Sequence, residues 1–142
     1  MPTINPNLIK FNKSDDLLNN FYTFWETADP NLLEKSVSKN LKDYDRAPGG
    51  SGSDYDATLA MAQSFGGLSN MNHTLQQVHY LDDGKMVVRW ECTAKHTGDV
   101  MGFPATQKEV AFFGHDIFQV VDGKITELWH IEGLLQLTAQ LK

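Results

Sequence analysis

The chain of 142 residues is poor in cysteine, in long apolar segments and in clustered positive charge. Cys92 is its single cysteine, which excludes an intramolecular disulfide and a zinc site built on cysteine ligands. The apolar runs are only a few residues long, far short of the roughly 20 residues that span a bilayer. The formal net charge is -6 and no Lys/Arg cluster occurs, so neither nucleic acid nor a membrane is expected as a partner.

Familiar binding motifs are also missing from the sequence. Gly98, Gly102 and Gly114 form neither a GxGxxG fingerprint nor a phosphate-binding loop. The histidines do not follow the spacing of metal ligands, so no metal site is expected. The amino-terminal segment MPTINPNLIK has neither the cationic start nor the apolar stretch of a secretory signal, and a cytoplasmic location is therefore expected.

What remains is typical of one ordinary globular domain. The chain is long enough for a single core, with 41% apolar and 21% charged residues. Residues 1–13 carry two prolines and show no clear period, which suggests a lead-in arm. One domain is then expected over residues 14–142.

Helical patterns occupy the first half of this domain. Ser14 can cap a first helix, in which leucines and aromatic residues recur at helical spacing. Asp29 and Pro30 form the cap and the first residue of a second, shorter helix. A Gly/Pro loop over residues 43–53 precedes a third helix that ends near Phe65.

Strand patterns follow, with a short closing helix rich in leucine at the end of the chain. The expected strands cover residues 72–81, 85–96, 108–120 and 124–132. Helices followed by an antiparallel sheet indicate an α+β fold rather than alternating βαβ units. Both faces of the hairpin over residues 108–132 carry apolar groups, so a homodimer or larger homo-oligomer is expected to cover the outer face.

Ionisable groups lie among apolar neighbours on the last strands, as is typical of a pocket. The relation between Asp116 and His130 depends on the turn between their strands. A three-residue loop at 121–123 places Asp116 opposite Leu128 and next to His130, whereas a two-residue turn leaves Asp116 opposite Trp129. The three-residue loop is favoured because it places Asp116 on the more apolar face.

Two segments, RWECTAKHTGDVMGFPATQKEV and GHDIFQVVDGKITELWHIEGLLQLTAQL, resemble the SnoaL-like polyketide cyclases and ester cyclases of the NTF2-like superfamily. FYTFWETADPNLLEKSVSKNLKDYD resembles them more weakly, and the resemblance extends from about Ser14 to Leu141. It implies a conical barrel, in which a curved antiparallel sheet packs against the N-terminal helices and leaves a deep apolar pocket. It also implies a cofactor-independent enzyme that closes a carbon ring by intramolecular aldol addition, with an acidic residue as acid/base.

An aldol closure needs one group to remove a proton beside a carbonyl and another to protonate the developing alkoxide. Asp116 and His130 are the candidates for these roles. In the relatives the acidic residue comes from the last part of the sheet, but here His130 follows Trp129 and Gly133 stands where relatives often carry aspartate. The alternatives are thus that the acidic group is absent, that it is Asp116 or Glu132, or that an imidazole replaces it.

Further residues are expected to surround a small apolar ligand: Trp90, His96, Phe112, Phe118, Glu132, Tyr22 and Trp25. Structural roles are the alternatives, with His96 as the anchor of a loop and most of the aromatic residues as core. His73, His79 and His115 are interpreted as surface or packing residues. For the whole protein, the alternatives to a cyclase are a ligand-binding protein without catalysis and a proton-transfer enzyme like ketosteroid isomerase or an epoxide hydrolase.

Overall fold

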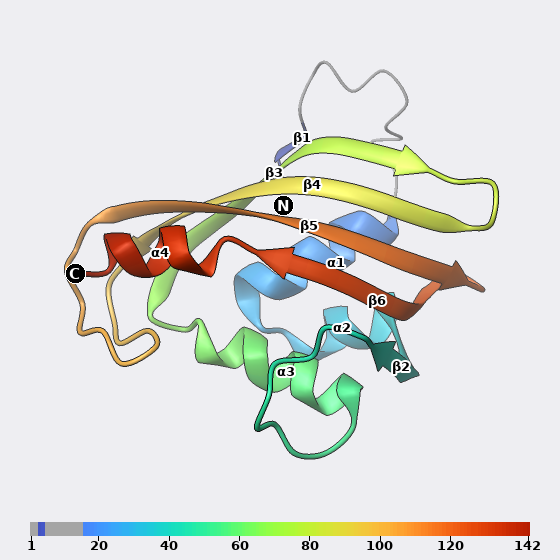
Figure 1. The fold of residues 1–142 in the computed structure, drawn as a ribbon, viewed down its shortest axis with the longest axis horizontal. Helices are drawn as coiled ribbons and strands as arrows, with labels where there is room; N and C mark the ends of the chain where they lie inside the picture. Colours follow the sequence, from blue (N-terminus) through green and yellow to red (C-terminus); the bar gives the residue numbers. More distant parts are fainter. Residues whose placement is uncertain (1–2, 5–15) are drawn as a thin grey trace.

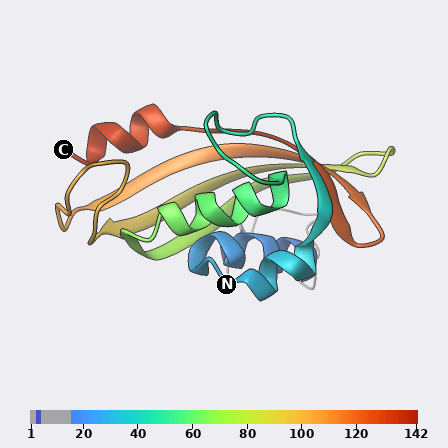
Figure 2. The same ribbon diagram turned by 90° about the horizontal axis from the view of Figure 1, so that it is seen from below.

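The computed structural model describes Thr3–Ile4 and residues 16–142 as a curved sheet with helices on its concave face (Figure 1). The strand order is β1-β3-β4-β5-β6-β2, and Figure 2 shows α1, α2 and α3 together on one side of the sheet. The α+β prediction is therefore confirmed. The elements are β1 (Thr3–Ile4), α1 (Asp16–Thr27), α2 (Pro30–Ser36), β2 (Val37–Asp43), α3 (Asp54–Ser64), β3 (Leu68–Tyr80), β4 (Lys85–His96), β5 (Glu109–Val121), β6 (Lys124–Glu132) and α4 (Leu134–Gln140).

Side-chain caps define where the second and third helices begin. Asp29 accepts a hydrogen bond from the backbone N–H of Asn31, directly before Pro30 at the start of α2. Ser53 accepts one from the N–H of Asp56 and so caps α3. The predicted cap of the first helix, Ser14, lies outside the described residues.

The edges of the sheet depart from the predicted antiparallel arrangement. Residues 37–43, expected at the end of a helix and the start of a loop, form β2, which pairs parallel with β6. Thr3–Ile4, placed in the lead-in arm, pairs parallel with β3. The four strands between these edges are antiparallel, as predicted.

The turn between β5 and β6 combines features of both predicted alternatives and matches neither. Asp122 and Gly123 have positive φ angles of 51° and 76°, as a two-residue type I′ turn requires. The register then shifts by one residue at Thr126, which bulges out of β6. Asp116 consequently pairs with His130, so the favoured three-residue loop is wrong and so is a regular two-residue hairpin.

The core lies between the concave face of the sheet and α1, and it is rich in aromatic contacts. Phe21 of α1 packs edge-on against Phe118 of β5, with ring centroids 5.4 Å apart. At the far end of the sheet, α4 packs against β5, where the Gln140 side chain hydrogen-bonds both backbone groups of Ala111. Among the described residues, no helix is long and apolar enough to cross a membrane.

Candidate active site

Asp116 is a carboxylate buried in the concave face of β5, with 6% of its surface exposed. Its Oδ2 atom accepts a hydrogen bond of 2.7 Å from the Tyr22 hydroxyl of α1. Oδ2 also accepts one of 2.9 Å from the indole Nε1–H of Trp90 on β4. Within the described ranges nothing donates to Oδ1, so one oxygen is fixed and the other is available to a ligand.

Burial raises the pKa of Asp116 to about 7, because the carboxylate has lost its hydration. The hydrogen bond from Tyr22 opposes this rise, Glu132 adds to it, and the His130 charge and the Trp90 N–H oppose it more weakly. Burial and the adjacent Asp116 also raise the pKa of Tyr22, so its hydroxyl stays protonated as a donor. Near neutral pH, Asp116 is therefore present in both protonation states, as acid/base catalysis requires.

His130 lies opposite Asp116 but is enclosed by carboxylates. Its Nδ1 is 2.6 Å from Glu132 Oε1, and its Nε2 is 3.0 Å from Asp43 Oδ1. Its backbone N–H donates to Asp45 Oδ2 at 2.9 Å. Burial lowers the pKa of His130, but the hydrogen bonds to Asp43 and Glu132 outweigh this effect and raise it to about 10. The ring is a fixed cation with both nitrogens engaged.

His96 lies at the end of β4 and has a structural role, distinct from that of Asp116 and His130. The residue is fully buried, with Nδ1 2.9 Å from Thr106 Oγ1 and Nε2 3.2 Å from the Phe103 carbonyl oxygen. Both contacts lie in the loop that connects β4 to β5. His96 thus anchors this loop, which is the structural alternative considered above.

The predicted aromatic residues divide between the Asp116 cluster and the core. Tyr22 and Trp90 contact the carboxylate directly. Phe112 packs edge-on against Trp90 at 5.6 Å, and Phe118 packs against the first helix. Trp25 points to a different place, a cavity at the end of the helices.

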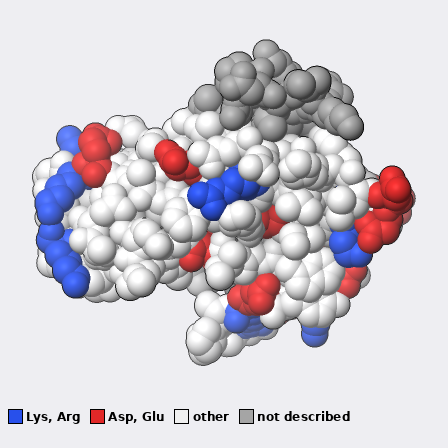
Figure 3. Space-filling model, turned by 45° about the horizontal axis from the view of Figure 1, so that its top comes forward, with Lys and Arg blue, Asp and Glu red and all other residues white. Residues whose placement is uncertain are grey.

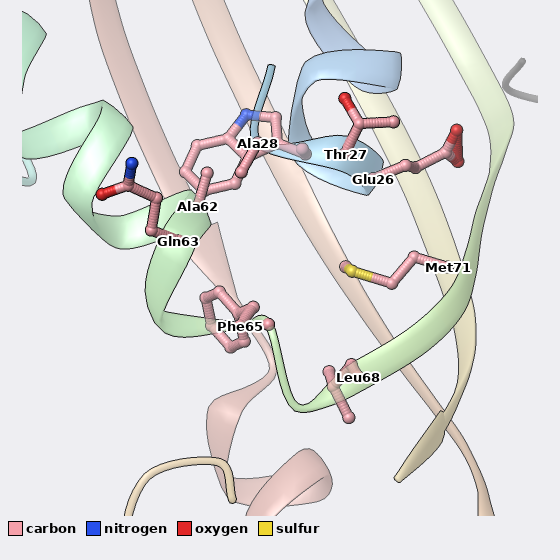
Figure 4. A pocket seen from close by; sticks show the side chains of 10 residues that line it. Glu26, Thr27, Ala28, Ala62, Gln63, Phe65, Leu68 and Met71 are labelled. Carbon is pink, nitrogen blue, oxygen red and sulfur yellow. The ribbon is translucent and has the colours of Figure 1, made fainter. Parts of the chain in front are cut away.

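This cavity has a volume of about 190 Å³ and lies where α1 and α3 end and β3 begins (Figure 4). Ligand pockets usually exceed roughly 300 Å³, so the cavity in this form holds about one small ring system. Asp116 is not part of its wall. The lining residues are Trp25, Glu26, Thr27, Ala28, Ala62, Gln63, Phe65, Gly66, Leu68 and Met71.

Glu26 and His73, which were not among the predicted site residues, form a buried pair between this cavity and Asp116. Glu26 Oε2 is 3.3 Å from Nδ1 of His73 and accepts the backbone N–H of His73 at 2.9 Å. A signal was present in the spacing, because His73 lies two residues before the fully buried Leu75 on β3. Among the described residues, no group of three His, Cys, Asp or Glu side chains could hold a metal ion.

Residues 15–141 match the sequence model described as "SnoaL-like polyketide cyclase". The chain belongs to the SnoaL-like polyketide cyclase family. Its structure is an NTF2-like α+β cone, as the resemblance implied, although the sheet is open and mixed rather than wholly antiparallel. A comparison with curated proteins gave no match.

Solved structures similar to this SnoaL-like protein cover nearly its whole length. TsrD from Streptomyces laurentii is 21% identical, with a TM-score of 0.77 over 93% of this chain and 98% of TsrD. A "putative polyketide cyclase" from Bacillus cereus is 29% identical, with a TM-score of 0.76 over 99% of this chain and 91% of that protein. IdmH from Streptomyces antibioticus, also described as a "putative polyketide cyclase", is 20% identical, with a TM-score of 0.75 over 92% of this chain and 99% of IdmH.

Proposed function

We propose that this SnoaL-like protein is a cofactor-independent cyclase that closes a ring in a small apolar, polyketide-like substrate by intramolecular aldol addition. The observation that carries the proposal is the buried Asp116 carboxyl, whose pKa of about 7 lets it both take and give a proton at neutral pH. Tyr22 and Trp90 hold Oδ2, so Oδ1 is the atom that exchanges the proton with the substrate.

His130 then acts through its charge rather than by proton transfer. Its ring nitrogens are occupied by Asp43 and Glu132, and its charge favours the ionised form of Asp116. The two residues titrate as a coupled pair, in which Asp116 exchanges protons while His130 stays protonated. His130 is therefore a positioning and charge-balancing residue in this proposal.

Two other functions remain candidates for the same fold. Ligand binding without catalysis is favoured by one observation, because Asp116 does not line the cavity of about 190 Å³. An isomerase of the ketosteroid type or an epoxide hydrolase would use the same carboxyl for a different proton transfer. We further propose that the protein acts in the cytoplasm as a homodimer.

A set of acyclic polyketide methyl esters tests the cyclase proposal. An aldol addition changes no mass, so mass spectrometry coupled to chromatography should detect an isomeric ring product. Replacing Asp116 by Asn is expected to lower turnover by about a hundredfold to ten-thousandfold. Asp122→Asn, at the exposed β5–β6 turn, is the matched control. Unchanged turnover in the Asp116→Asn variant contradicts the proposal, and a hydrolysed or double-bond-shifted product identifies one of the other reactions.

A further inference from the structure

We propose that His73, oriented by Glu26, is the imidazole that removes the substrate proton, while Asp116 serves as its acid partner. This inference rests on the proposed function and assigns a second catalytic residue to the same site. His73 takes the role that the sequence suggested for His130.

The Glu26–His73 pair has the arrangement of a carboxylate that orients a base. Only 3% of His73 is exposed, and the side chains of His73 and Glu26 are 4% and 6% exposed. Glu26 accepts both the backbone N–H and the ring Nδ1–H of His73 through the same oxygen. An ionised carboxylate can only accept, so Nδ1 carries the proton and Nε2 of the neutral ring keeps its lone pair.

The second ring nitrogen distinguishes His73 from His130. Nε2 of His73 has no hydrogen-bond partner within the part of the chain that the structure describes, whereas both nitrogens of His130 are held by carboxylates. His73 is thus a buried imidazole whose second nitrogen is left for a substrate atom. A ring nitrogen without a partner inside the protein is available to accept a hydrogen bond or a proton from a ligand.

Ring contacts place His73 beside the Asp116 carboxyl. The imidazole centroid lies 5.4 Å from that of Tyr22 and 5.2 Å from that of Trp90. These are the two side chains that donate to Asp116 Oδ2. His73 and Asp116 therefore contact the same two aromatic side chains.

Glu26 connects this pair to the cavity at the end of the helices. It belongs to the cavity wall together with Trp25 and Met71, and Figure 4 shows Glu26 and Met71 on the same side. Through the contact between Glu26 and His73, the wall of the cavity is one hydrogen bond away from the imidazole ring. In this proposal the first ring of the substrate binds in the cavity.

The proton transfers balance without a cofactor. Nε2 of His73 takes the proton from the carbon beside a carbonyl, and the C–H electron pair forms the enolate. The enolate carbon bonds to a second carbonyl carbon of the same molecule, and the resulting alkoxide takes the proton of neutral Asp116. Glu26 stabilises the imidazolium, which returns its proton to the Asp116 carboxylate through water and restores both groups.

Nitrogen-15 NMR of the histidine rings tests the pair on the free protein, without a substrate. At about pH 8 we expect His73 to show a protonated Nδ1 and an unprotonated Nε2, while His130 shows two protonated nitrogens. In the Glu26→Gln variant the amide donates to Nδ1, so the ring is expected to switch to the Nε2–H tautomer. A His73 ring that is protonated at Nε2 in the wild-type protein overturns the proposal.

Elimination of 5-nitrobenzisoxazole, a flat carbon acid whose ring opens when a base removes its proton, tests the chemistry. We expect His73→Gln to lower the rate roughly a hundredfold and Glu26→Gln about tenfold, by analogy with the loss of one general base. His79→Gln, an exposed position on the same strand, should leave the rate unchanged. Equal rates for the wild-type protein and His73→Gln, or no reaction with either, would overturn the role of His73.

The same measurements separate this inference from the cyclase proposal. Turnover of a polyketide ester that depends on Asp116 but not on His73 leaves the cyclase proposal standing and removes His73 from it. Dependence of the elimination on His73, with no ring product from any ester, supports the base and rejects the cyclase.

Discussion

Gly114 lies directly opposite Trp90 in the pairing of β4 with β5 and leaves the space in which the indole ring lies. A Cβ atom at position 114 would be 2.2 Å from the indole Cζ2 atom and 2.6 Å from Cε2, far inside van der Waals contact. The indole in turn donates its N–H to Asp116, two residues further along β5. A missing side chain on one strand therefore positions the hydrogen-bond donor of the carboxylate.

Gly114→Ala is expected to displace the indole and destabilise the protein by about 1–3 kcal/mol, the usual cost of overpacking a core. The Trp90 N–H resonance should move in an NMR spectrum because its bond to Asp116 is lost, and denaturant unfolding gives the change in stability. Gly50→Ala is the control, since its new methyl group meets only the end of the flexible Arg46 side chain. An unchanged Trp90 resonance in Gly114→Ala would show that the indole tolerates the methyl group.

The raised pKa of Asp116 gives a stability prediction with a definite sign. The folded-state value of about 7 lies above the ordinary 3.8, so the folded protein holds this proton more tightly than the unfolded chain does. The contribution of Asp116 to stability is present below about pH 4 and is lost as the pH rises to about 7, above which the buried charge is a constant cost.

The change in the free energy of unfolding caused by Asp116→Asn should therefore be more favourable at about pH 8 than at about pH 4. The upper limit of this difference is about 4 kcal/mol, at 1.36 kcal/mol for each pH unit by which the pKa is raised. The measured difference should be smaller, because the amide N–H₂ of the new side chain needs a hydrogen-bond acceptor. Urea unfolding of both proteins at the two pH values measures the difference. A variant that is equally affected at both values would show that Asp116 titrates normally in the folded state.

His130 gives a second dependence in a separate pH range. Its pKa of about 10 lies above the ordinary 6.5, so its ion pairs with Asp43 and Glu132 stabilise the protein fully below about pH 6.5. This stabilisation is lost as the pH rises through about 10. We expect the loss to be about 1–2 kcal/mol, because solvent screens these partly exposed carboxylates.

Comparing the wild-type protein with His130→Gln isolates this effect, since lysine titration is common to both. Thermal unfolding should show a smaller decline between pH 6.5 and pH 10 in the variant. His79→Gln, an exposed position, is the control. An equal decline in all three proteins would place the His130 pKa near its ordinary value.

Much of the fold was predictable because local patterns agree with the tertiary structure. The range of β4 was predicted to the residue, since one face of the strand is mainly apolar and buried while most residues of the other face are polar. β2 was not predicted, because only Val37 and Leu41 in it are buried and its sequence therefore shows no alternation of apolar and polar residues. Its pairing depends on β6, more than 80 residues away in the sequence.

The site was only partly predictable, for a related reason. Asp116 was recognisable as a charge on an apolar strand face, but its exact partner depended on the bulge at Thr126, which no turn motif in the sequence marks. His73 was missed because only Leu75 marks its buried face, since β3 shifts register on either side of this pair, between Ser69 and Asn72 and between Leu75 and Gln77. Its partner Glu26 lies 47 residues away on α1, and local sequence patterns do not show contacts between residues so far apart in the chain.

The outer face of the sheet supports the predicted homodimer. Ile117 and Trp129 are paired neighbours there, and Ile131 next to them is 68% exposed. Figure 3 shows uncharged areas on this side of the molecule, interrupted near its centre by acidic and basic groups, with further charges toward both ends. Such an apolar patch is unusual on a monomer and fits an isologous contact between two copies.

Light scattering at micromolar concentration should therefore give the mass of a dimer for the wild-type chain. Ile131→Glu is expected to give the monomer mass, because two copies of the new charge would face each other across a two-fold axis without a partner. Met61→Glu is the matched control, since Met61 is an exposed apolar residue of α3, on the helical side of the sheet. A stable dimer buries about 800 Å² on each copy, so Trp129 and Ile117 must contribute as well as Ile131. A monomer mass for the wild-type protein, or a dimer that persists in Ile131→Glu but dissociates in Met61→Glu, would place the contact elsewhere or remove it.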